Sequence, residues 1–323
     1  MDWTPDETQQ MVSDLGRQVL SGADRSWGAL IAAGLHEVEG LAATVALLVE
    51  VGRTASPIPA LETLVLGAPL RAAGLVGPEA VLTAGLRDAD GFDPRRPTLR
   101  VVDGRATGEK VAVPALDQAA FCLLPAEDGL YAVDLQGPGV ERQLGQGTND
   151  APLGSLRLCD APVVKLGDVA ARDRYLLVVD VGICALLLGL SQEALAMTAR
   201  YVSEREQFGR KIGTFQAVSQ RAADAWIETH AMSLTLWSAV FRLESGLPAE
   251  RAVAIARYTA AEGSHRVLAT AQHLHGGMGF DRDYALHRYF LTAKAWEFVG
   301  GGASAQLARL GALLAASAGQ SPS

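Results

Sequence analysis

The sequence is poor in cysteine, in basic charge and in long apolar runs, and each shortage excludes a class of protein. Only three cysteines occur among the 323 residues. Cys122, Cys159 and Cys184 lie far apart, and no spacing among them is typical of a metal site. We therefore expect buried free thiols, no bound metal, and a location in the reducing cytoplasm.

The apolar pattern does not indicate membrane insertion or export. The most apolar run, from Leu176 to Leu190, spans about 15 residues and contains Asp180, whereas a bilayer-spanning helix needs roughly 20. We interpret this run as a buried helix. The opening segment MDWTPDETQQ contains neither the basic region nor the apolar run of a signal peptide. The net charge of −8 opposes non-specific binding to nucleic acid and anionic lipid, so neither is an expected partner.

The hydrophobic pattern predicts an α+β protein of several domains. A chain of 323 residues, 49% of them hydrophobic, is longer than one hydrophobic core usually supports. Helical periodicity covers residues 1–78, short runs separated by glycine, proline and aspartate cover 79–167, and a long helical pattern covers 168–316. We predict an N-terminal helical domain, a middle β-barrel or sandwich and a C-terminal four-helix bundle, with a disordered tail at 317–323.

The segment YVSEREQFGRKIGTFQ, residues 201–216, contains groups suited to a dinucleotide. Arg205 offers a fixed fork of donors that matches a pyrophosphate, Gln207 adds an amide, and Phe208 adds a flat apolar face. The alternative is a solvated helix end in which Arg205 pairs with a carboxylate.

A second segment, QHLHGGMGFDRDYALHRYF at residues 272–290, contains a glycine-rich turn. Glycines such as Gly276 and Gly277 let a backbone approach a ligand closely and expose its amides, although a helix C-cap also explains them. His273 and His275 are two residues apart and point in different directions on a helix, so we do not expect them to bind a metal.

These two segments, in this order, resemble the signatures of the acyl-CoA dehydrogenase superfamily. The second departs from the family pattern by one residue, because three residues separate Gln272 from Gly276. The resemblance implies the fold described above and FAD as cofactor. It also implies that each segment reaches across a subunit interface, with Arg205, Gln207, Phe208, Gln272, Gly276 and Gly277 contacting the FAD of a neighbouring subunit.

The resemblance also shows what is missing. The family's reaction needs a carboxylate base opposite the flavin, and the position equivalent to its usual glutamate is Gly300. Other members place the base on the first bundle helix, at the position of Val179, beside Asp180. Glu297 and Asp180 are the available substitutes. The family's flavin-ring loop is also not reproduced between Leu82 and Pro114.

We therefore expect a subunit of a heteromeric acyl-CoA dehydrogenase that lacks its own base. Its partners would be a longer homologous subunit, most simply in a heterotetramer, an acyl-CoA substrate and an electron-transfer flavoprotein. The short form resembles small subunits of bacterial enzymes that act on steroid side-chain CoA thioesters. Two alternatives stay open: a self-sufficient homomeric dehydrogenase that uses Asp180 or Glu297, and a scaffold or acyl-CoA-binding protein without flavin.

Overall fold

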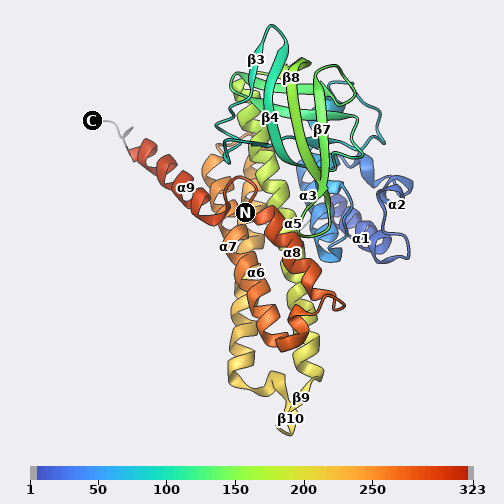
Figure 1. The fold of residues 1–323 in the computed structure, drawn as a ribbon. Coiled ribbons are helices and arrows are strands. Elements are labelled where there is room, and N and C mark those ends of the chain that lie inside the picture. The colour runs from blue at the N-terminus through green and yellow to red at the C-terminus, as the bar shows by residue number, and fades with distance from the viewer. Residues whose placement is uncertain (1–5, 319–323) are drawn as a thin grey trace.

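The computed structural model describes residues 6–318, and its elements follow the order helical, β, helical along the chain (Figure 1). This order and the mixed architecture confirm the predicted fold class. The first helical region ends at Ala72, the first strand begins at Thr83, and the long bundle helix begins at Val169. Whether the chain divides into separate domains at 78/79 and 167/168 stays a prediction.

The N-terminal region is a group of short helices packed beside the bundle. Asp6 begins the first helix, because its side chain accepts a hydrogen bond of 2.8 Å from the Gln9 amide. Pro57 and Pro59 precede a five-residue π-helical turn. The elements are α1 (Glu7–Ser21), α2 (Trp27–Ala32), η1 (Leu35–Glu37), α3 (Leu41–Thr54), η2 (Glu62–Leu66) and α4 (Ala68–Ala72).

The middle region is an eight-stranded sheet in which one long strand joins two halves. β8 pairs with β6 near its C-terminal end and with β4 and β7 over its N-terminal part. Apolar side chains from both halves form one small core. The strands are β1 (Thr83–Ala84), β2 (Arg87–Asp88), β3 (Arg100–Val102), β4 (Arg105–Pro114), β5 (Phe121–Ala126), β6 (Gly129–Asp134), β7 (Val140–Gln146) and β8 (Pro152–Gly167).

The C-terminal region is built around α5, which runs from the sheet to the far end of the bundle (Figure 1). A short hairpin forms that far end, and α9 points away from the body of the molecule. The elements are α5 (Val169–Glu204), β9 (Glu206–Gln207), β10 (Arg210–Lys211), η3 (Ile212–Thr214), α6 (Gln216–Glu244), α7 (Glu250–His275), η4 (Gly276–Phe280), α8 (Leu286–Glu297) and α9 (Gly302–Ala318).

Helix α5 packs against both the N-terminal helix α3 and the other helices of the bundle. It is long and apolar enough to cross a membrane, but 89% of its apolar window is buried within the protein, which is the environment of a core helix. Two glycines let α3 lie directly on it. A Cβ at Gly189 would lie 2.0 Å from the Val49 carbonyl oxygen, and one at Gly52 would lie 2.4 Å from the Leu186 carbonyl oxygen. The N-terminal helices therefore have a fixed position against the bundle.

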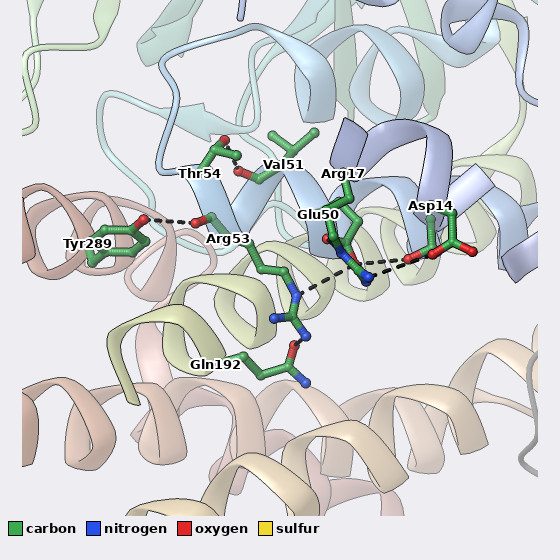
Figure 2. A network of polar contacts seen from close by, with 9 residues as sticks. Asp14, Arg17, Glu50, Val51, Arg53, Thr54, Gln192 and Tyr289 are labelled. Carbon is green, nitrogen blue, oxygen red and sulfur yellow. Dashed lines mark hydrogen bonds and ion pairs between the residues drawn. The ribbon is translucent and has the colours of Figure 1, made fainter. Parts of the chain in front are cut away.

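A polar network around Glu50 adds to that attachment (Figure 2). The Glu50 carboxylate, only 3% exposed, accepts a hydrogen bond of 2.9 Å from Arg17 on α1 and lies 3.5 Å from Arg53 Nε on α3. Arg53 donates to Gln192 on α5 over 2.7 Å, and its carbonyl accepts from the Tyr289 hydroxyl on α8 over 2.8 Å. Four helices thus meet at one set of hydrogen bonds.

One expectation about cysteine was wrong. Cys122 and Cys184 are buried, and burial raises the pKa of each thiol to about 12. Cys159 is exposed, because β8 alternates sides and its inward positions there belong to Leu156 and Leu158. Of the expected tail at 317–323, α9 extends through Ala318, and the remaining residues lie outside the described part of the chain.

Candidate functional site

The hairpin at the far end of the bundle presents an aromatic side chain to solvent. β9 and β10 pair antiparallel with Gln207 opposite Arg210, so Phe208 and Gly209 form a two-residue turn. Both turn residues are left-handed, with φ of 56° and 77°. This conformation favours asparagine and glycine, and a bulky residue is strained in it. Phe208 is also 92% exposed. The Phe208 ring lies edge-on to Phe215, with centroids 6.2 Å apart, and its exposure leaves most of the ring available to a partner.

The polar groups beside Phe208 are free to bind a ligand. Arg205 follows the last residue of α5, its side chain is exposed, and within residues 6–318 it makes no ion pair. The Gln207 amide is also exposed and donates only to the neighbouring Glu206 carbonyl, over 2.8 Å. A guanidinium, an amide and an aromatic face are thus available together at the end of the helix.

The glycine-rich turn lies at the same end of the bundle. Gly276 ends α7 with φ of 60° and ψ of −136°, a conformation that essentially only glycine adopts. Gly277 has no such requirement, and no atom lies within 4 Å of a Cβ built on it. Gln272 is half-buried, and its amide reaches the Gly279 carbonyl over 3.4 Å. Both glycines are exposed, and the Gly276 amide donates to the His273 carbonyl.

A buried histidine joins the two segments. The His275 ring stacks on Tyr201 of α5 at 4.4 Å and lies 5.3 Å from the Tyr284 ring. Its Nδ1 lies 2.8 Å from the Ala271 carbonyl oxygen, and burial lowers the pKa of this histidine. Sequence reasoning considered His275 only as a metal ligand and missed this structural role. His273 is exposed instead, and the described residues contain no group of three or more metal-ligating side chains.

We call the resulting set the bundle-end residues. They lie on α5, on the hairpin and at the end of α7, and the Tyr201–His275 stack holds these segments against each other. They are Arg205, Gln207, Phe208, Gln272, Gly276 and Gly277.

Asp180, a candidate base, forms ion pairs with three arginines. It is 4% exposed and forms ion pairs with Arg95, with Arg309 at 3.1 Å and with Arg257 at 3.6 Å. These partners come from the loop before β3, from α9 and from α7. A carboxylate paired with three guanidinium groups has few lone pairs left for a proton. Its position indicates a structural junction.

Glu297, the other candidate, is also paired. Its Oε2 lies 2.6 Å from Lys294 Nζ, and the side chain is 10% exposed. The ammonium of Lys294 in turn lies 2.7 Å from His265 Nδ1. Glu297 is not among the residues that line the large cavity described below, whereas its neighbours Trp296 and Phe298 are.

The backbone at Gly300 explains why no side chain stands there. Gly300, Gly301 and Gly302 are all left-handed, with φ of 73°, 97° and 68°, and they turn the chain from α8 into α9. A residue with a Cβ is disfavoured by roughly 1 to 2 kcal/mol at each such position. Gly300 itself lines the cavity described below and contributes no side chain to it.

That cavity, of about 450 Å³, lies where the N-terminal helices, the sheet and the bundle meet. Most of its wall is apolar, with contributions from α3, α5, α8 and the strands β1 and β4. Glu62 also lines it, and sequence reasoning missed this residue. The available signal was its isolation, since Glu62 is the only charged residue between Pro57 and Pro69. None of the bundle-end residues lines the cavity.

The chain matches a protein-family model, a relative of known sequence and two solved structures. Residues 176–314 match the family model "Acyl-CoA dehydrogenase, C-terminal domain". The chain is 34% identical to acyl-CoA dehydrogenase FadE28 of Mycobacterium tuberculosis, over 97% of this chain and 98% of that protein. Among solved structures, it resembles a variant of the Tcur3481–Tcur3483 steroid ACAD, with 35% identity, a TM-score of 0.91 and coverage of 97% and 99%. It also resembles the ChsE4–ChsE5 complex from Mycobacterium tuberculosis, with 31% identity, a TM-score of 0.90 and full coverage of both chains.

Proposed function

The chain belongs to the acyl-CoA dehydrogenase family, and from that membership we propose that it is the short subunit of a heteromeric, FAD-dependent acyl-CoA dehydrogenase. In this proposal the complex removes hydrogen from the α and β carbons of an acyl-CoA thioester. This chain contributes the bundle-end residues to an FAD that is bound mainly by a longer partner subunit. The observation that carries the proposal is Phe208, held in a left-handed turn and 92% exposed.

The bundle-end residues fit part of a dinucleotide cofactor. The exposed Arg205 guanidinium can form charge-assisted hydrogen bonds to a pyrophosphate, and the exposed Gly277 leaves room for a ligand to approach the backbone. Phe208 offers a flat apolar face to an aromatic ring system. When bound, FAD supplies the hydride acceptor of the reaction. The task of this chain is to bind and orient that cofactor.

The chain's own interior supports a non-catalytic assignment for this subunit. Asp180 pairs with three arginines and Glu297 pairs with Lys294, so we propose neither as the base. The position equivalent to the family glutamate is Gly300. In our proposal the partner subunit supplies the base, and this subunit completes the partner's cofactor site. The homomeric alternative would need a free carboxylate at one of these positions.

The substrate, electron acceptor and location follow from the relatives and from the chemistry. One solved relative is named a steroid ACAD, and we propose a steroid side-chain CoA thioester as the substrate class. An electron-transfer flavoprotein is the proposed acceptor of the electrons. The free thiols Cys122, Cys159 and Cys184 suit the cytoplasm.

Flavin absorbance tests the proposal. We would purify the chain alone and after co-expression with a longer homologous subunit, and determine the mass of each assembly. Bound flavin and dehydrogenase activity only in the mixed assembly is the expected result. A yellow, active assembly of this chain alone would overturn the proposal. A colourless mixed assembly would favour the scaffold alternative.

A further inference from the structure

The cavity contains one carboxylate that no other residue satisfies. Glu62 is half-buried, and within residues 6–318 its side chain makes no ion pair and no hydrogen bond to another residue. The other buried acids differ, since Glu50, Asp88, Asp180 and Glu297 each pair with a cation. An unpaired carboxyl group in a largely apolar enclosure favours its neutral form, whose O–H needs an acceptor that a ligand oxygen can supply.

The backbone holds Glu62 in place. It begins a π-helical turn, closed by a hydrogen bond of 2.7 Å from the Gly67 amide to the Glu62 carbonyl. Such wide turns are rare and frequently occur at functional sites. The turn packs closely on α5, because a Cβ at Gly182 would lie 2.6 Å from Leu61 Cδ1. The Tyr175 hydroxyl donates to the Leu66 carbonyl over 2.8 Å and secures the other end.

Most of the rest of the wall is apolar, which favours a largely apolar ligand. Leu61, Leu66, Leu186, Leu190 and Trp296 line the space, and a volume of about 450 Å³ is within the usual range for small-molecule sites. The charged side chains on the lining are Arg25, Arg87, Arg288 and Asp150, apart from Glu62 itself.

We propose that Glu62 is a specificity-determining residue of this cavity, where its carboxyl group hydrogen-bonds the hydroxyl or keto oxygen of an otherwise apolar ligand such as a polycyclic alcohol. The ligand need not react, because the base position at Gly300 carries no carboxylate. The cavity is separate from the bundle-end residues, so binding here does not depend on the cofactor half-site.

The proposal implies that binding weakens as the pH rises. Burial raises the pKa of the Glu62 carboxyl to about 7. Below that value the neutral acid can donate to a ligand oxygen, and above it an apolar ligand must enclose a charge. An affinity that depends on the neutral form falls about tenfold between pH 6 and pH 8.

Other ionisable groups lie near the turn. On α5, burial raises the pKa of Tyr175 well above its usual value and that of Cys184 to about 12. Asp180, also on α5, forms an ion pair with Arg95. From α4, Arg71 donates to the His36 carbonyl over 2.9 Å. His287 also lines the cavity, and the Glu62 substitutions below leave it in place.

Fluorescence titration with two matched probes tests the proposal. Pyrenemethanol carries a hydroxyl on a rigid four-ring hydrocarbon, and methylpyrene has nearly the same shape without the oxygen. We expect the full chain at pH 6 to bind the alcohol about five- to tenfold more tightly than the hydrocarbon, which is the contribution of one hydrogen bond. Glu62→Leu should abolish this preference, Glu62→Gln should keep it but remove the pH dependence, and Glu39→Gln, an exposed control, should change nothing.

Thermal unfolding of the variants provides an independent readout. Because the pKa of Glu62 is raised in the folded state, burying its charge lowers stability above pH 7 and not below about pH 4.5. The melting temperature of Glu62→Gln should therefore exceed that of the unmodified chain at pH 8, and the difference should vanish at pH 4.5. Equal affinity for both probes, or an alcohol preference that survives Glu62→Leu, would overturn the proposal. So would a Glu62→Gln complex that binds the probes normally but loses turnover, since Glu62 would then be a base.

Discussion

Polar side chains at the two ends of the bundle differ in their burial and ion pairing. At the hairpin, Arg205, Gln207 and Phe208 are exposed and Phe208 is also strained, so the fold gains little from them. Beside the sheet, Asp180 and Glu297 are buried and satisfied by cations of the same chain. Charged groups at the first end are available to a partner, and those at the second stabilise the fold. The comparison supports the proposed subunit, which contributes to a neighbouring site and supplies no base of its own.

The strongest test of this contrast is removal of the Asp180 carboxylate. Asp180→Asn leaves Arg95, Arg257 and Arg309 close together without their counter-ion. We expect the free energy of unfolding to fall by about 3 to 5 kcal/mol, as measured by urea denaturation.

The control for this prediction is an exposed ion pair. Asp14 lies 3.6 Å from Arg17, and both side chains are more than half exposed. Asp14→Asn should change the free energy of unfolding by no more than about 0.5 kcal/mol. An Asp180→Asn protein of normal stability whose complex has no turnover would identify Asp180 as the base and break the comparison.

Removal of the Arg205 charge tests the opposite end. Arg205→Ala should leave unfolding unchanged, because the side chain is exposed and has no ion pair among the described residues. The Kd for FAD of the mixed complex should rise about ten- to a hundredfold, the effect of losing a charge-assisted contact. Arg142→Ala on β7 is the matched control and should not alter FAD binding. Unchanged flavin affinity in both variants would refute the assigned role.

Phe208 should show opposite effects on stability and binding. Phe208→Asn places a residue that tolerates positive φ in the turn, so the chain should become more stable by up to about 1 kcal/mol. The same change removes the aromatic face, so FAD should dissociate more readily from the complex. Thermal unfolding and flavin release measure the two effects. Leu144→Asn, at an exposed apolar residue of β7, should alter neither. A loss of stability in Phe208→Asn would show that the side chain serves the fold.

The fold could be predicted from the sequence because it depends on local patterns, whereas the role of the bundle-end residues stays a prediction. The change from helical periodicity to short alternating runs identified the β region. The segments around Arg205 and Gly276 are each contiguous, so their spacing was visible directly.

The cavity and the buried charges could not be predicted, because their partners are distant in the sequence. Asp180 meets Arg95 and Arg309 across 85 and 129 residues, and no periodicity reports such pairs. Glu62 was overlooked because its significance depends on an enclosure formed by three regions of the chain. His275 was weighed as a ligand because its stacking on Tyr201 depends on the packing of α7 against α5.

The smallest expected effect is that of Glu297→Gln. This change tests whether the interior of the chain is structural or catalytic. Glu297→Gln replaces a buried carboxylate by an amide whose oxygen can still accept from Lys294, so the free energy of unfolding should fall by only about 1 kcal/mol. Turnover of the mixed complex should stay within about twofold, because this side chain does not line the cavity. A loss of several orders of magnitude with normal folding would mean that the carboxylate reaches substrate in the assembled enzyme. In that case the interior of this chain would be catalytic, and the proposed division of labour between the two ends of the bundle would fail.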